Sequence, residues 1–454
     1  MNSPSQPPPG FRNYRWIICA LLFFSTTFNY LDRQVISYLK DYVFCVPVAQ
    51  GGFGWSNKDF SFLTSFFTAF YAGMTLGVGW LIDRIGTKLG LALSLIFWSV
   101  CGMANAFVGR LLVMHIFIRS AFAVGEAGNF PASIKTVAEW FPKRERALAT
   151  GIFNSGSNAG AMIAALAVPW ILIHFTRQLG WKMAFILTGA SGFLWLIFWF
   201  WLYDTPHKQK RLSRAEYDYI HIDDGAVAKE ANGDKGKLVW WRLFSYRQGW
   251  AFFSGKFMTD GIWWFYLFWL PDYLHKQFQM TTAQVMLPTF IVYGISIVGS
   301  IYGGSIPLTL IRKGMPVYQA RMTAMFLIAL APLAVLLTQY FGEVSRFGGM
   351  AATLAVAMIS IGAAAHQAWS ANLYTTVSDL FPKKAVASVT GIGTTAGGIG
   401  GVIVQLLAGV LTDAFKNHPQ TAYLLMFIVC AFSYLIAWSA MKLLVPRHQP
   451  ITDL

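Results

Sequence analysis

Long apolar stretches and short polar stretches alternate along the whole chain. We place twelve apolar spans, numbered one to twelve, at residues 16–39, 59–82, 89–109, 111–137, 147–174, 182–203, 248–275, 285–311, 318–340, 347–376, 386–413 and 422–444. An α-helix needs roughly 20 apolar residues to cross the hydrocarbon core of a bilayer, and each span is about that long or longer. The pattern predicts an all-α polytopic membrane protein with 12 transmembrane helices.

The composition supports the same class. Hydrophobic residues occupy 56% of the 454 positions and charged residues only 12%, whereas an ordinary soluble domain has about 25% charged residues. So few charges cannot cover the surface of a water-soluble globule of this size. The composition therefore excludes a soluble enzyme, a disordered chain and a disulfide-rich scaffold.

An internal repeat at an offset of 240 residues divides the chain into two related halves. The tripeptide at residues 141–143 recurs at 381–383, and span five shares further positions with span eleven: Ala147/Ala387, Thr150/Thr390, Gly151/Gly391, Ile152/Ile392 and Gly160/Gly400. Duplicated six-helix halves are typical of one large class of secondary transporters. We expect two pseudo-symmetric six-helix bundles at residues 1–205 and 248–454, joined by a cytoplasmic linker at 206–247.

The linker contains charges of both signs and few apolar residues, with a short helix predicted around Arg214–His221. This composition is typical of a solvated tether, so we assign the linker no function from its sequence.

The net charge of +15 is distributed unevenly. With both termini placed in the cytoplasm, 22 of the 35 Lys and Arg residues lie in or beside cytoplasmic segments, eight in outside loops and five within spans. This asymmetry follows the positive-inside rule. The basic excess thus indicates an orientation with both termini cytoplasmic, and it does not indicate a nucleic acid partner.

A charged motif stands in the loop after span two, at Gly79-Trp80-Leu81-Ile82-Asp83-Arg84-Ile85-Gly86-Thr87-Lys88. Glycine lets helices approach closely. A carboxylate such as Asp83 can accept hydrogen bonds from the backbone N–H groups at a helix N-terminus. Arg84 and Lys88 suit the cytoplasmic face. We expect Gly79, Asp83, Arg84 and Lys88 to act in gating, the alternative being a charged turn that only obeys the positive-inside rule.

The corresponding loop of the second half departs from this motif. Leu308 and Thr309 stand where the first half has an Asp-Arg pair. We therefore expect the cytoplasmic gate to lack one charged latch on that side, with the fold unaffected.

Ionisable residues within the spans are the strongest functional signal. Asp32 and Arg33 lie in span one, and Arg119 and Glu126 lie in span four. Each costs about 2.5–3.5 kcal/mol at the centre of a lone helix. Arg119 and Glu126 are seven residues apart and share a helix face. We expect Asp32, Arg33 and Arg119 to converge at similar depth in a functional site, with Glu126 nearer the cytoplasm. Structural ion pairs between helices are the alternative.

Three further spans contain polar or aromatic clusters. Span ten contains His366, Gln367, Trp369, Ser370 and Asn372, which suit a polyhydroxylated ligand because they combine a stacking ring with amide and hydroxyl groups. Span five adds Asn154, Ser155, Ser157 and Asn158, although Ser155 and Gly156 are also suited to helix packing.

Span seven has a run of aromatic residues at 263–269 that can line a site, face lipid or form the interfacial belt. In the same span, Lys256 and Asp260 are four residues apart and can neutralise each other. We interpret that pair as structural.

The sequence gives no indication of a metal or cofactor. Cys19, Cys101 and Cys430 lie within spans and Cys45 is alone in the first outside loop, so no pairing is suggested. The histidines in the spans are scattered and lack metal-ligand spacing, which argues against a membrane-embedded enzyme. A channel would need pore rings from symmetric subunits, so a single chain with two unlike halves argues against a channel.

Taken together, these motifs resemble the major facilitator superfamily, and within it the anion:cation symporter family and the bacterial hexuronate transporters. The resemblance rests on Gly79–Lys88 and on the segments Asn29–Gln34, Gly125–Pro131, Lys135–Pro142, Gly151–Ser157 and Ala365–Asn372, together with the aromatic run of span seven.

The resemblance implies that Arg33 binds the carboxylate of a substrate, that Tyr30 lines the pocket and that Asp32 and Glu126 handle protons. The other expected substrate-binding residues are Arg119, Asn154, Ser157, Asn158, His366, Gln367, Trp369 and Asn372. The expected function is proton-coupled hexuronate import by alternating access, with symport of an aldonate or another small carboxylate as the alternative.

Further expectations follow from this resemblance. The protein is expected to act as a monomer in the bacterial cytoplasmic (inner) membrane, with a small organic anion, a proton and the lipid bilayer as its partners. No cofactor is expected.

Overall fold

The computed structural model describes residues 13–222, 240–381 and 383–451, apart from a few side chains within these ranges. In the first half the helices are α1 (Tyr14–Leu39), α2 (Asn57–Ile85), α3 (Thr87–Ala104), α4 (Leu112–Glu126), α5 (Asn129–Trp140), α6 (Lys143–His174) and α7 (Arg177–Leu202). The linker contains α8 (Arg214–Ile220).

The second half contains α10 (Arg247–Phe278), α11 (Thr282–Arg312), α12 (Val317–Leu330), α13 (Thr338–Phe341), α14 (Val344–Phe347), α15 (Ala351–Leu380), α16 (Lys383–Ala414) and α17 (Pro419–Leu444). The described residues form an all-helical fold, and the expected spans are confirmed as helices with two interruptions. Span four breaks at Ala127 and Gly128 into α4 and α5, and span nine continues from α12 through a 3₁₀ segment at Ala331–Leu337 into α13.

Eight described helical segments are long and apolar enough to cross a membrane by themselves. They correspond to spans three, five, six and eight to twelve. Spans one, two, four and seven are more polar, because α1, α2, α4 and α10 bury charged and hydroxyl side chains against other helices. These polar residues therefore lie inside the protein rather than facing lipid.

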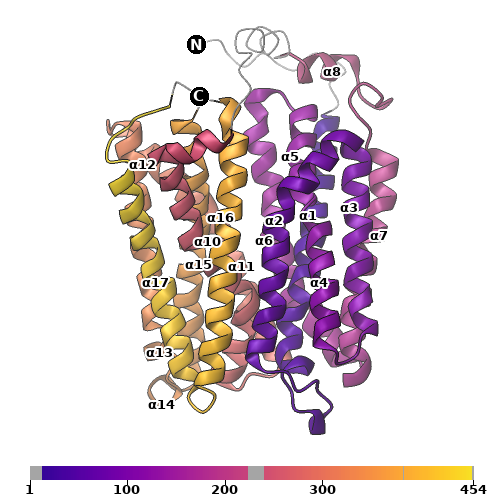
Figure 1. The fold of residues 1–454 in the computed structure, drawn as a ribbon, viewed down its shortest axis with the longest axis vertical. Helices are drawn as coiled ribbons and strands as arrows, with labels where there is room; N and C mark the ends of the chain where they lie inside the picture. Colours follow the sequence, from indigo (N-terminus) through magenta and orange to yellow (C-terminus); the bar gives the residue numbers. More distant parts are fainter. Residues whose placement is uncertain (1–12, 223–239, 382, 452–454) are drawn as a thin grey trace.

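The two halves stand side by side, and their helices run roughly parallel to the long axis of the molecule (Figure 1). Helix α2 packs on α16, α6 packs on α11, and α1 contacts α10. We call the end where α1 begins and α17 ends the terminal end, and the opposite end the far end.

Matching glycines pack the same pair of helices in each half. A Cβ atom at Gly160 of α6 would overlap the carbonyl oxygen of Thr27 in α1, and one at Gly400 of α16 would overlap that of Phe257 in α10. Both glycines allow two helix backbones to approach closely. Gly160 and Gly400 belong to the sequence repeat, so the repeat corresponds to an equivalent helix contact.

Ionic contacts join the two halves at the far end. Lys40, which follows α1, pairs with the buried Asp272 of α10. Asp272 also pairs with Lys276 at 2.9 Å and accepts a hydrogen bond from Tyr423 of α17. Nearby, the Asp413 carboxylate of α16 accepts from the backbone N–H groups of Asn57 and Lys58 at 3.0 and 2.8 Å. These contacts hold the two halves together at the far end.

The linker helix α8 is docked on the first half. The buried carboxylate of Glu216 accepts hydrogen bonds from the backbone N–H groups of Tyr14 and Arg15, at 2.9 and 3.1 Å, and so caps α1. Tyr219 donates to Glu145 of α6 at 2.6 Å. The predicted helix is confirmed, but the prediction of a solvated tether is wrong for this segment, while residues 223–239 lie outside the described ranges.

Candidate functional site

The charged residues of spans one and four meet in the interior of the first half. Arg33 Nε of α1 donates to Glu126 Oε2 of α4 at 2.9 Å, and the two side chains are 1% and 0% exposed. Arg33 Nη2 also donates to Asn29 Oδ1 at 3.1 Å. Glu126 is the last residue of α4, and the break at Ala127 and Gly128 follows it directly. The direct Arg33–Glu126 pair differs from the sequence-based expectation, in which Glu126 lies nearer the cytoplasm than Asp32, Arg33 and Arg119.

Four aromatic rings surround the Arg33 guanidinium. Its central carbon lies 4.3 Å from the ring centre of Tyr30, 4.6 Å from Tyr71, 5.2 Å from Trp264 and 5.4 Å from Phe67. Rings at such distances attract a cation through their negative faces. Trp264 comes from α10, so Arg33 lies at the boundary between the two halves.

Asp32 and Arg119 complete the cluster in different ways. Asp32 Oδ2 accepts from the indole N–H of Trp98 at 3.2 Å. Arg119 donates to the carbonyl oxygen of Arg33 at 3.4 Å, and its guanidinium carbon lies 4.2 Å from the ring centre of Phe122. Among the described residues Arg119 forms no ion pair, because the neighbouring Glu126 carboxylate is turned toward Arg33.

Several buried polar atoms of this cluster have no hydrogen-bond partner among the described residues: Asp32 Oδ1, Glu126 Oε1, Arg119 Nε and Arg119 Nη1. Unsatisfied buried polar atoms cost free energy, so each calls for an explanation. Free carboxylate oxygens and guanidinium donors side by side can hold a proton and an anion. The cluster thus offers the chemistry of a proton-linked anion site.

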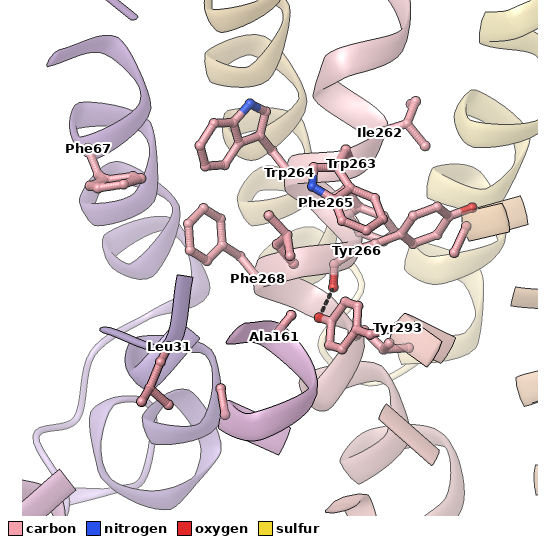
Figure 2. Close-up of a cluster of buried hydrophobic side chains, with 14 of the residues drawn as sticks. Leu31, Phe67, Ala161, Ile262, Trp263, Trp264, Phe265, Tyr266, Phe268 and Tyr293 are labelled. Carbon is pink, nitrogen blue, oxygen red and sulfur yellow. Dashed lines mark hydrogen bonds between the residues drawn. The ribbon is translucent and has the colours of Figure 1, made fainter. Parts of the chain in front are cut away.

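The aromatic run of α10 is buried rather than exposed to lipid. Trp263 and Trp264 are 8% and 9% exposed, and Trp269 is fully buried. In Figure 2, Trp264 and Phe268 point from α10 toward Phe67 of α2. The lipid-facing alternative is therefore wrong for these three tryptophans, because α10 is enclosed by α1, α15, α16 and α17.

Lys256 and Asp260 of α10 form the expected ion pair. Their Nζ and Oδ2 atoms are 2.5 Å apart, and Lys256 Nζ also donates to the hydroxyl of Tyr374 in α15 at 3.0 Å. The pair is largely buried, and Asp260 is its more exposed member.

The polar residues of span ten are mostly engaged within the second half. His366 stacks on Trp263 with ring centres 5.1 Å apart, and its Nδ1 atom lies 2.9 Å from the hydroxyl of Tyr434. Asn372 donates to the carbonyl oxygens of Gly303 and Ala368, both at 2.9 Å. Trp369 is fully buried and Gln367 half-buried. The structure does not bring these side chains together with Arg33.

The polar residues of span five, which is helix α6, lie in different environments. Asn154 is exposed, Ser157 donates to its carbonyl oxygen at 2.7 Å, and the buried Asn158 Oδ1 has no partner among the described residues. A Cβ at Gly156 would overlap the carbonyl oxygen of Phe23, which confirms helix packing at that position.

The motif after span two lies at the terminal end. Gly79 faces Pro131 of α5, the Arg84 guanidinium lies 3.8 Å from the ring centre of Trp80, and Lys88 pairs with Asp204 at 3.0 Å. The side chain of Asp83 lies outside the described part of the structure. In the second half, Leu308 is exposed and Thr309 donates to its own helix at Ser305.

Several residues of interest escaped the sequence analysis. The four rings around the Arg33 guanidinium are called the Arg33 cage below. Two of them, Phe67 and Tyr71, could not be singled out from the sequence, because aromatic residues make up 16% of the chain. Lys40 and Asp272 could have been noticed, since a carboxylate near the end of an apolar helix needs a partner. In the described part of the chain no cluster of His, Cys, Asp and Glu could hold a metal ion.

Comparisons with known proteins agree with this fold. The profile of the Major Facilitator Superfamily matches residues 22–405. The hexuronate transporter of Escherichia coli strain K12 is 29% identical over 95% of each chain. The D-galactonate transporter of Escherichia coli O6:H1 is 27% identical over 94% of this chain and 96% of its own.

Among solved structures, a bacterial homologue of the human lysosomal transporter Spinster, in an inward-facing and unoccupied conformation, superposes with a TM-score of 0.71 at 17% identity. The match covers 95% of this chain and 98% of the other. At this identity the likeness concerns the fold alone.

Proposed function

Because the chain belongs to the Major Facilitator Superfamily, whose members are transporters rather than enzymes, we propose that it is a proton-coupled symporter for a hexuronate such as glucuronate or galacturonate. Relatives that match nearly the whole chain are transporters of hexuronates and of galactonate. An aldonate such as galactonate is therefore the second candidate substrate. Both classes are polyhydroxylated acids with one carboxylate.

The buried Arg33–Glu126 pair is the observation that supports this proposal most directly. A guanidinium binds carboxylates with charge-assisted hydrogen bonds, and Glu126 occupies one of its donors. When Glu126 takes up a proton it loses its charge, and Arg33 becomes available to the carboxylate of a substrate. Substrate and Glu126 thus compete for one cation, which links anion binding to proton binding.

The net charge of the cluster supports the same coupling. Asp32, Arg33, Arg119 and Glu126 sum to zero when both acids are ionised, and protonation of one acid leaves one positive charge. In a low-dielectric site, that charge attracts a monoanion much more strongly than it would in water. A proton and a monoanion therefore enter together, and entry of the anion alone is disfavoured.

The hydroxyl groups of the substrate need neutral partners. We assign them to Tyr30 and to Asn154, Ser157 and Asn158 of α6, and in another state of the transport cycle to His366 and Gln367 of α15. Trp369 and Asn372 are buried among helices of the second half. They would contact substrate only in another state of the transport cycle.

We propose that the protein works as a monomer in a bacterial inner membrane, with the terminal end in the cytoplasm, as the distribution of Lys and Arg favours. The far-end contacts of Lys40, Asp272 and Asp413 then form a closed outer gate. In this conformation the substrate site is reached from the cytoplasm. The inner gate is formed by Gly79, Asp83, Arg84 and Lys88. Alternating access would require the far-end contacts to break.

Uptake into proteoliposomes tests the proposal. Purified protein is reconstituted, a pH gradient that is acidic outside is imposed, and radiolabelled glucuronate is added. A symporter should accumulate the label above its external concentration, and a protonophore should abolish accumulation. Downhill flux alone would contradict proton coupling, and absence of flux for every sugar acid would contradict the transport proposal.

A competition panel then distinguishes the two substrate classes. Unlabelled glucuronate, galacturonate, galactonate and glucose are each added during glucuronate uptake. Glucose should compete poorly, because it leaves the buried Arg33 without an anion. Stronger competition by galactonate than by either uronate would favour the aldonate assignment.

A further inference from the structure

One face of α10 continues from the Arg33 cage toward the terminal end. Lys256, Asp260 and Trp264 are spaced four residues apart, so they lie along one side of the helix. The ring centre of Trp264 is 5.2 Å from the Arg33 guanidinium carbon. Because an α-helix rises 1.5 Å per residue, Asp260 and Lys256 lie about 6 and 12 Å further along α10. A six-carbon acid held by Arg33 extends over a distance comparable with the rise from Trp264 to Asp260.

A contact with α15 fixes the position of the pair. Lys256 Nζ donates to the hydroxyl of Tyr374 at 3.0 Å. The Lys256–Asp260 pair is therefore anchored within the second half, on the helix whose Trp264 reaches Arg33.

The exposure of the pair suits contact with a small molecule. The Lys256 side chain is 5% exposed, whereas that of Asp260 is 18% exposed. A purely structural ion pair does not need to be accessible to a small molecule. An accessible carboxylate within the membrane-spanning region is rare unless it has a function. Asp260 can accept from hydroxyl groups, while Lys256 fixes the position of its carboxylate.

The charge of the pair determines what it can recognise. Lys256 and Asp260 neutralise each other, so they offer hydrogen bonds to hydroxyl groups but no net positive charge. A second carboxylate placed here would meet Asp260, and like charges repel strongly where water is excluded. Arg33 and its neighbours can bind one anionic group, whereas the Lys256–Asp260 pair can bind none.

We propose that Lys256 and Asp260 form a hydroxyl-binding subsite that makes the transporter select sugar acids with one carboxylate over sugar acids with two. This inference rests on the proposed function, because it takes Arg33 as the site of the first carboxylate. The pair then acts as a specificity filter: it rejects aldarates such as galactarate by charge and accepts the hydroxylated end of uronates and aldonates.

Competition in proteoliposomes tests the filter. The concentrations of unlabelled galactarate and galacturonate that halve glucuronate uptake are measured for the wild type and for Asp260→Asn. In the wild type galactarate should be at least about tenfold weaker than galacturonate. In Asp260→Asn the unpaired Lys256 offers a positive charge, so the ratio of the two concentrations should fall about tenfold.

Two further variants control for other effects of the substitution. Lys256→Gln/Asp260→Asn has no charge at the pair, so it should return the ratio toward the wild-type value. Asp379→Asn removes the same charge from the Arg321–Asp379 pair, within one half and away from the Arg33-facing side of α10, and should leave the ratio unchanged.

Two results would overturn the inference. One is equal competition by galactarate and galacturonate in the wild type, which needs no variant to fold. The other is an unchanged ratio in an Asp260→Asn protein that still transports glucuronate. Failure of the wild type to transport any sugar acid would instead refute the proposed function, so the two failures are distinguishable.

Discussion

In the proposed mechanism, substrate binding and proton coupling both depend on Arg33. Its guanidinium forms an ion pair with Glu126 and lies near aromatic rings from both halves. Substrate binding at this residue must therefore displace a carboxylate and reorient aromatic rings. At the residue scale, mutation should separate two effects: that of the Arg33 guanidinium on substrate binding and that of Glu126 protonation on coupling.

We expect Arg33→Lys to lose most uptake although it keeps the charge. A guanidinium presents several donors in a fixed plane, whereas an ammonium is a compact point charge that cannot bind a carboxylate through two parallel hydrogen bonds. The concentration of glucuronate that gives half-maximal uptake should rise at least about tenfold. A value near that of the wild type would contradict the carboxylate assignment.

Glu126→Gln should separate binding from coupling. The amide resembles the protonated acid, so the variant should still bind glucuronate and exchange it across the membrane, since neither step needs proton release. It should fail to accumulate glucuronate against a gradient, because the carrier can no longer reset by deprotonation. Counterflow and pH-driven uptake in the same proteoliposomes measure the two activities.

Asp32→Asn is the control for that experiment, because Asp32 lies in the same cluster with one free carboxylate oxygen. If Glu126→Gln concentrates glucuronate normally and Asp32→Asn does not, the coupling acid is Asp32.

At the scale of single elements, α6 shows how close packing supports the site. Gly156 and Gly160 lie against the backbone of α1, which positions Asp32 and Arg33 one turn further along α1. The α4–α5 break places Glu126 at a helix end beside Arg33. The site is thus held by backbone contacts and a helix break, and its geometry depends on residues that touch no substrate.

Gly160→Ala should destabilise the protein, because the added methyl group would overlap the Thr27 carbonyl oxygen and the Tyr30 Cβ atom. Overpacking of this kind costs about 1–3 kcal/mol. Gly151→Ala in the same helix is the matched control, since a Cβ there meets nothing within 4 Å. Thermal unfolding of the purified variants should show a lower midpoint for Gly160→Ala alone, and equal midpoints would refute the packing role.

At the scale of the whole molecule, the far-end contacts join the two halves and form the outer gate of the proposed transport cycle. The Asp272 carboxylate is shared by Lys40, Lys276 and Tyr423, so it joins the first half to two helices of the second. Breaking a buried ion pair by removing one partner costs about 3–5 kcal/mol. A change of that size is large enough to shift the balance between two conformations of a transporter.

Asp272→Asn should therefore open the far end. Without the carboxylate, Lys40 and Lys276 repel each other across the boundary between the halves. Ser65 is buried and donates to the Val402 carbonyl oxygen across that boundary at 3.5 Å. In a variant without native cysteines, Ser65→Cys should be labelled severalfold faster by a membrane-impermeant maleimide when Asp272→Asn is present. Asp379→Asn should not change the rate, and equal rates in all three proteins would contradict a gating role.

The sequence by itself determined the helical membrane fold, the two-half organisation and the four ionisable residues of the N-terminal cluster. These features follow from local physics: apolar runs must span lipid as helices, and charges within them need partners or a function. Only the tertiary structure decided that Arg33 pairs with Glu126, that Trp264 reaches it from the other half and that Asp272 joins Lys40. It also decided that α8 docks on α1 and that Asn372 serves helix packing. These contacts link residues far apart in the chain, and which partner a buried charge takes depends on how the helices pack against each other.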